Sequence, residues 1–386
     1  MIMQFRRAPS SAGTDTGTGM ERGQPVDAAR PFDVRRTTRA SRVALVAGLA
    51  VAVAFAFAPM WAGRDTMHDL TQFVAYLVFA LMWNLLAGYG GMVSIGQQAF
   101  FGIGGYAMLI LANVCGVSPF VAVPLAALIA AALAVPVSLV AFRLEGGYFA
   151  IGTWVIAEVC RLTFANVSAL GGGSGTSLTA LADVPRALRD ALTVWLALAI
   201  AVATLGLLYG FLRSRAGLAL GAMRDNAVAA GSQGIDVRRV RLAVYVVAAA
   251  GAALAGGLYF VGNLRISPDA AFSVNWTAFA IFMVLIGGLG TLEGPIIGAL
   301  LFYLLNKFLS DYGTLYLIGL GVLAIVVTTF FPRGIWGFVA ERYGLQLFPL
   351  GRRVVFADAP ASPAEPRATP GGDARHEDGG PAAHQA

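Results

Sequence analysis

Charged side chains are scarce in this 386-residue sequence. Asp, Glu, Lys and Arg together make up 12% of the chain, and Lys307 is its only lysine. A soluble domain carries roughly 25% charged residues, so most of this chain is unsuited to water. Hydrophobic residues make up 58%, and the 47 glycines supply the small side chains that let membrane helices pack closely. These proportions exclude an ordinary soluble domain and predict an all-α integral membrane protein.

Motifs of catalysis are also lacking. The sequence has no Gly-x-x-x-x-Gly-Lys-Ser/Thr phosphate loop, no His-Glu-x-x-His and no Gly-x-Ser-x-Gly. Its two cysteines, Cys115 and Cys160, lie in or beside apolar runs and are expected to be unpaired. We therefore predict no enzyme activity, no cofactor and no metal site. The formal net charge of +6 comes from arginines at the ends of apolar runs, which indicates membrane topology and no nucleic-acid partner.

Apolar runs long enough to cross a bilayer recur along the chain. A span needs roughly 20 mostly apolar residues, and its backbone must be helical because open sheet edges cannot be satisfied in lipid. The predicted spans are 43–60, 70–88, 97–114, 119–142, 147–167, 193–212, 242–262, 276–290, 295–309 and 314–331. We expect about ten transmembrane helices. An eight-helix alternative requires re-entrant segments, for which 89–114 and 287–300 are the candidates.

Arginines predict the orientation, because cytoplasmic loops carry an excess of Lys and Arg. They gather in the N-terminal stretch and in the 213–241 loop, namely Arg6, Arg7, Arg22, Arg30, Arg35, Arg36, Arg39, Arg42, Arg213, Arg215, Arg224, Arg238, Arg239 and Arg241. With ten spans both stretches and both termini are cytoplasmic.

The predicted organisation has three parts. Residues 1–42 form a disordered cytoplasmic tail, and 43–340 form a permease domain that includes the 213–241 loop. Residues 341–386 form a second cytoplasmic tail, disordered from about 357. Arg35-Arg36 before an apolar run leaves a twin-arginine signal peptide as an alternative, but the run is long enough to be a retained helix.

The 213–241 loop has helical character despite its polarity. Leu218, Ala222, Asp225 and Ala229 recur at helical spacing, and Gly234 suits a left-handed helix end. A helix there has a face of small residues, formed by Ala219, Ala222, Met223, Ala229 and Ala230. The pattern is equally compatible with a coupling helix that docks into a cytoplasmic partner and with an amphipathic connector on the membrane surface.

Polar and glycine residues inside the spans are candidates for a translocation path. Breaks in membrane helices are tolerated where protein or a water-filled cavity receives the freed backbone groups, and free amides there suit a zwitterionic substrate. The candidates are Asn84, Gly96, Gln97, Gln98, Gly102, Thr153 and Glu158. Simple packing contacts are the alternative role of the glycines.

The surroundings of two acidic residues, Glu158 and Glu293, can be predicted from their positions in or beside the spans. Glu158 and Arg161 are spaced to pair on one helix, and charges at that depth usually face a bundle interior. Glu293 is expected to be solvated at a turn.

Four motifs, which follow one another in the family's order over about residues 68–340, resemble those of the LivM-type permease of branched-chain amino-acid ABC importers. They are Asn84–Tyr106, Arg143–Thr153 followed by Glu158 and Arg161, the loop that ends at Gly234-Ile235, and Ile266–Asp269 with Gly287–Pro295. Departures from the family pattern are Ala227 in place of a glutamate, the stretch 231–234, and the stretch 170–176.

The resemblance implies a permease subunit of an ATP-driven importer in a bacterial inner membrane. The implied partners are two ATP-binding subunits, a second permease subunit in a heterodimer, a substrate-binding protein and membrane lipid. The implied contacts with the ATP-binding subunits are Gly221, Arg224, Asp225, Ala229, Ala230 and Gly234. The substrate is predicted to be a branched-chain or other hydrophobic amino acid, with urea or a short amide as the alternative. An ion-coupled carrier, with Glu158 as its one candidate relay, is a further alternative.

Overall fold

The computed structural model of the chain describes residues 32–35, 39–309, 312–343, 347–348 and 353–356. It contains two compact units, of which one comprises 1–35 and 352–386 and the other 36–351. In the first unit, strand β1 (Phe32–Arg35) pairs antiparallel with strand β4 (Arg353–Phe356), so that Phe32 lies opposite Phe356. Most of the two predicted tails, 1–31 and 357–386, lies outside the described residues.

The second unit is a bundle of helices. Its longer helices are α1 (Arg39–Ala56), α3 (Arg64–Asn84), α4 (Gln98–Asn113), α5 (Pro119–Ala141), α6 (Gly147–Ala165), α7 (Arg186–Arg213), α10 (Val237–Asn263), α12 (Asn275–Gly287), α13 (Glu293–Leu309) and α14 (Thr314–Phe330). The shorter helices are α2 (Ala58–Trp61), η1 (Leu85–Tyr89), η2 (Ser168–Leu170), η3 (Gly172–Ser174), α8 (Arg215–Asp225), α9 (Ala227–Ser232), α11 (Pro268–Ala271) and α15 (Gly334–Tyr343). Strands β2 (Thr176–Ser177) and β3 (Arg265–Ile266) form a short antiparallel pair.

Seven segments of the described chain are long and apolar enough to cross a membrane. They are Arg64–Tyr89, Pro119–Ala141, Gly147–Ala165, Arg186–Arg213, Val237–Asn263, Pro268–Gly287 and Leu315–Tyr343. Each predicted span coincides with a helix of the bundle, but α1, α4 and α13 are shorter than the other spans. The prediction of an all-α membrane protein is confirmed, while the count of ten spans stays a prediction.

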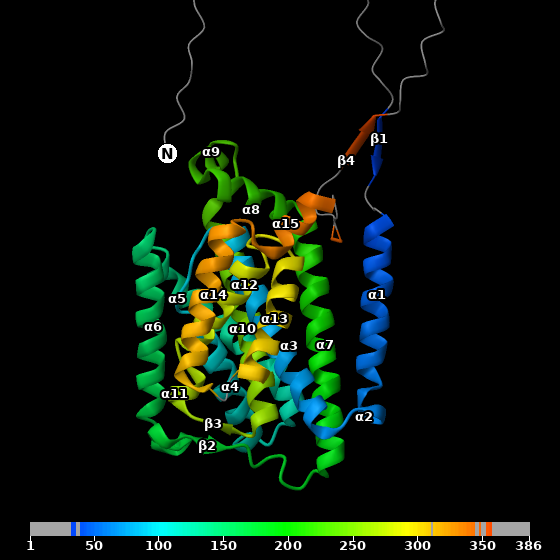
Figure 1. Ribbon diagram of the computed structural model, residues 1–386. Coiled ribbons are helices and arrows are strands. Elements are labelled where there is room, and N and C mark those ends of the chain that lie inside the picture. Colours follow the sequence, from blue (N-terminus) through cyan, green and yellow to red (C-terminus); the bar gives the residue numbers. More distant parts are fainter. Residues whose placement is uncertain (1–31, 36–38, 310–311, 344–346, 349–352, 357–386) are drawn as a thin grey trace, which may run out of the picture. The chain divides into compact units, whose positions relative to one another are not determined.

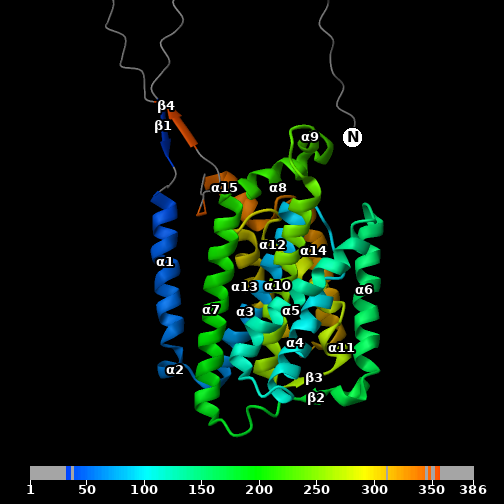
Figure 2. The ribbon, with the colours of Figure 1, turned by 180° about the vertical axis from the view of Figure 1, so that it is seen from behind.

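The bundle has two ends, which lie opposite each other in Figures 1 and 2. Helices α8, α9 and α15 lie at one end, called here the α8 end. Helix α2 and the β2–β3 pair lie at the other, called here the β2 end. Most long helices run between these ends, as expected for segments that cross a bilayer.

Helix α10 is central to the bundle and packs against α3, α4 and α5. Small residues allow this approach: a Cβ atom on Gly256 would lie 1.9 Å from the Phe101 carbonyl oxygen of α4. Close backbone approach of this kind is how helices associate where lipid removes the hydrophobic drive.

Aromatic side chains fill the space between α3, α4, α10, α12 and α13. Phe101 stacks on Trp276 with ring centroids 4.1 Å apart, and Tyr76 meets Phe302 edge to face at 5.2 Å. Phe79 and Tyr259 complete this aromatic cluster. The interior of a single subunit is therefore filled by side chains in this conformation.

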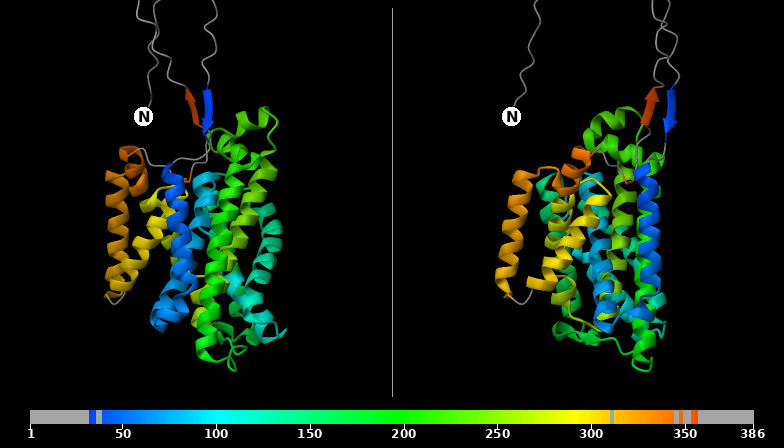
Figure 3. Two further views of the ribbon diagram at one scale, coloured as in Figure 1. Left: turned by 90° about the vertical axis from the view of Figure 1, so that its right-hand side faces the viewer. Right: turned by 45° about the vertical axis from the view of Figure 1, so that its right-hand side comes forward.

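Helices α6 and α14 contribute little to this interior. Only 17% of the α6 span, and the same share of the span that contains α14, is buried within the chain. Figure 3 shows α14 at the edge of the bundle in both views. Their exposed apolar side chains are suited to lipid or to another membrane subunit.

The Gly256 contact gives a test of the packing. We expect Gly256→Ala to lower the free energy of unfolding by about 1–3 kcal/mol, because the new methyl group must displace the α4 backbone. Gly206→Ala is the matched control, since Gly206 lies within α7 and nothing lies within 4 Å of its Cβ position. Thermal unfolding in detergent measures both variants. Equal stability of the two would contradict the packing described here.

Candidate functional site

The chain loses its helical form between η1 and α4, over residues 90–97, called here the first break. Gly91 has φ +67°, a conformation that favours glycine. Trp83 donates its indole N–H to the Ser94 carbonyl oxygen at 2.9 Å, and the Gly96 N–H donates to the Ser94 hydroxyl at 3.2 Å. Backbone N–H and carbonyl groups that lack helical partners in the first break thus form hydrogen bonds with side chains of the protein.

A second break, residues 288–292, joins α12 to α13. Gly290 has φ +76°, again in the region that favours glycine. The Thr291 hydroxyl donates to the Gly288 carbonyl oxygen at 2.9 Å and accepts from the Gly294 N–H at 3.0 Å. This closed turn replaces the helical hydrogen bonds that end at Gly287.

Asn84, the last residue of α3, joins η1 to the second break. Its side-chain amide donates to the Thr291 carbonyl oxygen at 2.8 Å, and its Oδ1 accepts from the Gly290 N–H at 2.9 Å. The side chain is fully buried. Gly88 allows the close approach, because a Cβ atom there would lie 2.7 Å from the Gly290 nitrogen. Asn84 therefore holds the second break against the end of α3.

Arg224 of α8 lies against both breaks. A Cβ atom on Gly290 would lie 2.6 Å from Nη1 of Arg224, and one on Gly91 would lie 3.9 Å from its Cγ. Helix α8 also contacts η1. One side chain of the 213–241 loop thus lies beside both breaks, close to Gly290 and further from Gly91.

Capping residues account for the form of this loop. Ser214 accepts from the Ala216 N–H at the start of α8, Asn226 accepts from the Val228 and Ala229 N–H groups at the start of α9, and Asp236 accepts from the Arg239 N–H at the start of α10. Gly234 has φ +85°, which confirms the predicted left-handed end. The predicted helical character is confirmed, but Asn226 divides the helix in two.

The predicted coupling residues do not all face outward. Gly221, Asp225, Ala229 and Gly234 are exposed on the surface of α8, α9 and the following turn. Ala230 is buried, as is Met223 of the predicted small-residue face, so these two side chains support the helices from inside. Arg224 has exposed area and also reaches the two breaks.

Most of the predicted path residues gather where α4 begins. Gly96 contacts the Thr153 backbone of α6, and Gln98 Oε1 accepts from the Thr277 hydroxyl of α12 at 2.5 Å. Gln97 is 1% exposed, and neither oxygen nor nitrogen of its side-chain amide has a hydrogen-bond partner among the described residues.

Two other path candidates have structural partners. Thr153 donates its hydroxyl to the Ala150 carbonyl oxygen at 2.9 Å, within its own helix. Gly102 packs against the ring of Phe272, because a Cβ atom there would lie 2.4 Å from that ring.

Glu158 does not belong to this group. The predicted pair with Arg161 is confirmed at 2.6 Å, and Arg161 also contacts Asp269 at 2.5 Å. The Glu158 side chain is 45% exposed, so it does not face the interior.

The prediction that Glu293 is solvated was wrong. Glu293 is only 7% exposed, and its carboxylate accepts a hydrogen bond from the Phe348 N–H at 3.0 Å. The carboxylate lies at the start of α13, where an acidic group is favourable to a helix.

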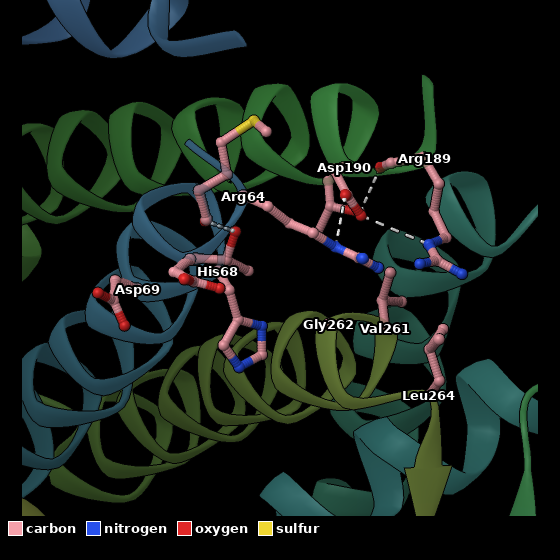
Figure 4. A pocket seen from close by; sticks show the side chains of 12 residues that line it. Arg64, His68, Asp69, Arg189, Asp190, Val261, Gly262 and Leu264 are labelled. Atoms are coloured by element: carbon pink, nitrogen blue, oxygen red, sulfur yellow. Dashed lines mark hydrogen bonds and ion pairs between the residues drawn. The ribbon is translucent and has the colours of Figure 1, made fainter. Parts of the chain in front are cut away.

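A cavity of about 380 Å³ at the β2 end was not anticipated from the sequence. Figure 4 shows His68 and Asp69 of α3, Arg189 and Asp190 of α7, and the end of α10 around it. Arg64 pairs with Asp190 at 3.3 Å.

An apolar helical bundle with buried polar groups at two broken helices defines a membrane transport subunit. Among the described residues, no group of three or more His, Cys, Asp or Glu side chains is arranged to hold a metal ion.

Comparison with known families gives the narrower assignment. The model of the family described as branched-chain amino acid transport system / permease component matches residues 67–330, and the chain belongs to this family. It is a membrane permease of a branched-chain amino-acid ABC importer, and separate subunits hydrolyse ATP.

Two relatives cover most of the chain. The high-affinity branched-chain amino acid transport system permease protein LivM of Escherichia coli (strain K12) is 26% identical over 329 residues, which are 78% of this chain and 76% of the relative. The probable branched-chain amino acid transport permease protein LivM of Methanocaldococcus jannaschii is 27% identical over 316 residues, 69% of this chain and 91% of the relative. No solved structure matches the chain.

Asn84 gives a test of how the breaks are held. We expect Asn84→Leu to destabilise the protein by about 2–5 kcal/mol, because the Gly290 N–H and the Thr291 carbonyl oxygen lose their partners in a buried site. Asn166→Leu is the control, since Asn166 is exposed and bonds within the turn of its own helix. Thermal unfolding in detergent distinguishes them. A loss of similar size in both variants would show that Asn84 has no special role.

Proposed function

We propose that this chain is one of two permease subunits of an importer in which ATP-binding subunits drive the two breaks through α8. The observation that carries the proposal is the position of Arg224 beside both Gly91 and Gly290. A segment that is exposed at one end of the bundle thereby reaches the positions where the membrane helices are interrupted. Broken helices form substrate sites in other transporters, so a contact on both breaks is suited to control access.

The α8 end is proposed to be cytoplasmic. It carries arginines such as Arg143, Arg213, Arg215, Arg238 and Arg241. At the β2 end, by contrast, some basic side chains pair with acids, as Arg64 does with Asp190 and Lys307 with Asp69. The positive-inside rule favours this orientation. Ten crossings then place both termini in the cytoplasm of a bacterial cell, with the permease domain in the inner membrane and the two tails on the cytoplasmic side.

Two ATP-binding subunits are proposed to grip α8 and α9 through the exposed Gly221, Asp225, Ala229 and Gly234. Small side chains leave room for another protein's surface, and Ala230 holds α9 to the bundle from inside. Movement of α8 would then displace Arg224, and with it both breaks. A second permease subunit, in a heterodimer, completes the path, because the aromatic cluster fills the interior of this one.

The substrate is proposed to be a branched-chain or other hydrophobic amino acid. A zwitterion needs hydrogen-bonding groups for its charged ends, and Gln97 offers a buried amide without a partner at the start of α4. Gly96, Gln98, Gly102 and Thr153 surround this start. A substrate-binding protein would deliver the substrate to the β2 end, where the cavity presents both Arg and Asp side chains.

Glu158 is not proposed as an ion relay. Its carboxylate is exposed and is held by Arg161, whereas a relay residue must sit on a path through the membrane. No observation favours the ion-coupled alternative. Urea and short amides remain competitors for the substrate, because they too would suit an amide such as Gln97.

Uptake by membrane vesicles tests this function. Vesicles that contain the chain with its ATP-binding and second permease subunits, supplied with the binding protein, should take up labelled leucine only when ATP is present. Unlabelled isoleucine in excess should suppress that uptake, and unlabelled urea should leave it unchanged. Uptake that survives ATP depletion, or suppression by urea instead of isoleucine, would contradict the proposal.

A further inference from the structure

A cavity of about 490 Å³ lies at the α8 end, between the last turns of α5 and the first turns of α10. Arg143, Arg238 and Arg241 line it, together with the apolar side chains Val135, Leu139 and Leu242. It therefore combines a cationic part with an apolar part in one space. Helices α5 and α10 pack directly against each other, so the cavity belongs to the rigid part of the bundle.

The cationic part of the cavity is not neutralised by the chain itself. None of its three arginines forms an ion pair with a carboxylate of the described residues, and Nε of Arg241 is buried without a hydrogen-bond partner there. The nearby Asp236 forms an ion pair with Arg239 at 2.9 Å, outside the three arginines of the cavity. Glu145 lines the adjoining cavity, which shares Arg241 and Phe142 with this one. The N-terminus of the 27-residue helix α10 adds further positive potential.

The apolar part of the cavity lies on the membrane side. Val135 and Leu139 are exposed on α5. Leu139 lies about one helical turn before Arg143, and Val135 lies about two turns before it. The cavity thus places cations at the end of a membrane-crossing helix and apolar side chains at the depth where hydrocarbon begins. A protein carboxylate or a free anion would use only the first of these parts, whereas an amphiphile uses both.

We propose that this cavity binds an anionic phospholipid of the leaflet at the α8 end. Its headgroup phosphate would lie between Arg143, Arg238 and Arg241, and an acyl chain would follow Val135 and Leu139. Arginine suits this role because its planar guanidinium pairs with two phosphate oxygens at once. The proposal does not depend on the substrate or on the ATP-binding subunits.

Native mass spectrometry of the purified full chain tests the site. The protein, in a neutral detergent, is mixed with equal amounts of phosphatidylglycerol and phosphatidylcholine. We expect retained phosphatidylglycerol to exceed phosphatidylcholine. In the variant with Arg143→Gln, Arg238→Gln and Arg241→Gln, the affinity for phosphatidylglycerol should fall by about tenfold or more, because each basic residue near the surface adds to the attraction.

A charge-matched control separates a built site from general attraction. Arg213→Gln, Arg215→Gln and Arg342→Gln remove the same charge from the same end of the bundle, outside the cavity. This control should keep its phosphatidylglycerol. Equal loss in the two triple variants, or equal retention of phosphatidylcholine by the unaltered chain, would overturn the proposal.

Two further measurements complete the test. Inorganic phosphate added in excess should not displace phosphatidylglycerol; displacement would mean that the site takes free phosphate instead of lipid. If the triple variant does not fold, as judged by thermal unfolding, Arg241→Gln alone takes its place. Full retention of phosphatidylglycerol by a folded Arg241→Gln variant would also overturn the proposal.

Discussion

The buried amide of Asn84 satisfies a constraint on which the rest of the bundle depends. A membrane helix can be interrupted only where other parts of the protein receive the freed backbone groups. Asn84 receives the Gly290 N–H and supplies a donor to the Thr291 carbonyl oxygen, so the second break is fixed to the end of α3. Without such partners the interruption would leave polar groups unsatisfied in an apolar interior, at a cost of about 1–3 kcal/mol for each group.

Arg224 connects this arrangement to α8, the helix proposed to bind the ATP-binding subunits. Asn84 joins the second break to α3, and Arg224 places α8 against the same glycine and against Gly91 of the first break. In the proposed function, movement of this helix displaces both interruptions together. Separate subunits of this family hydrolyse ATP, so the force on α8 comes from another subunit. The filled aromatic interior likewise supports the proposal that the path is shared with a second permease.

Local patterns in the sequence were enough to predict the membrane helices and the left-handed helix end at Gly234. Hydropathy located the membrane segments because each is an apolar run bounded by charge or glycine, and Gly234 marked a helix end because few other residues adopt φ +85°. Contacts between distant residues were not predictable in this way. Asn84 was predicted to line a path, yet it bonds to residues more than 200 positions away.

The surroundings of single charges were likewise hard to predict from local patterns. Glu293 was expected in solvent, but a backbone N–H from Phe348, 55 residues further on, covers it. Glu158 was correctly paired with Arg161, because that pair is local, but its exposure depends on where α6 packs. The cavity of Figure 4 is assembled from three helices, and no single stretch of sequence indicates it.

The central claim is that Arg224 transmits the movement of α8 to the breaks. The most direct measurement compares ATP-driven uptake with ATP hydrolysis in the assembled transporter for Arg224→Ala and for Arg215→Ala, which removes the same charge from the same helix. The account predicts that Arg224→Ala lowers uptake by about tenfold while hydrolysis continues, as expected for a lost coupling free energy of about 1–3 kcal/mol. Arg215→Ala should leave both rates unchanged. Normal uptake by Arg224→Ala, or equal losses in the two variants, would contradict the account.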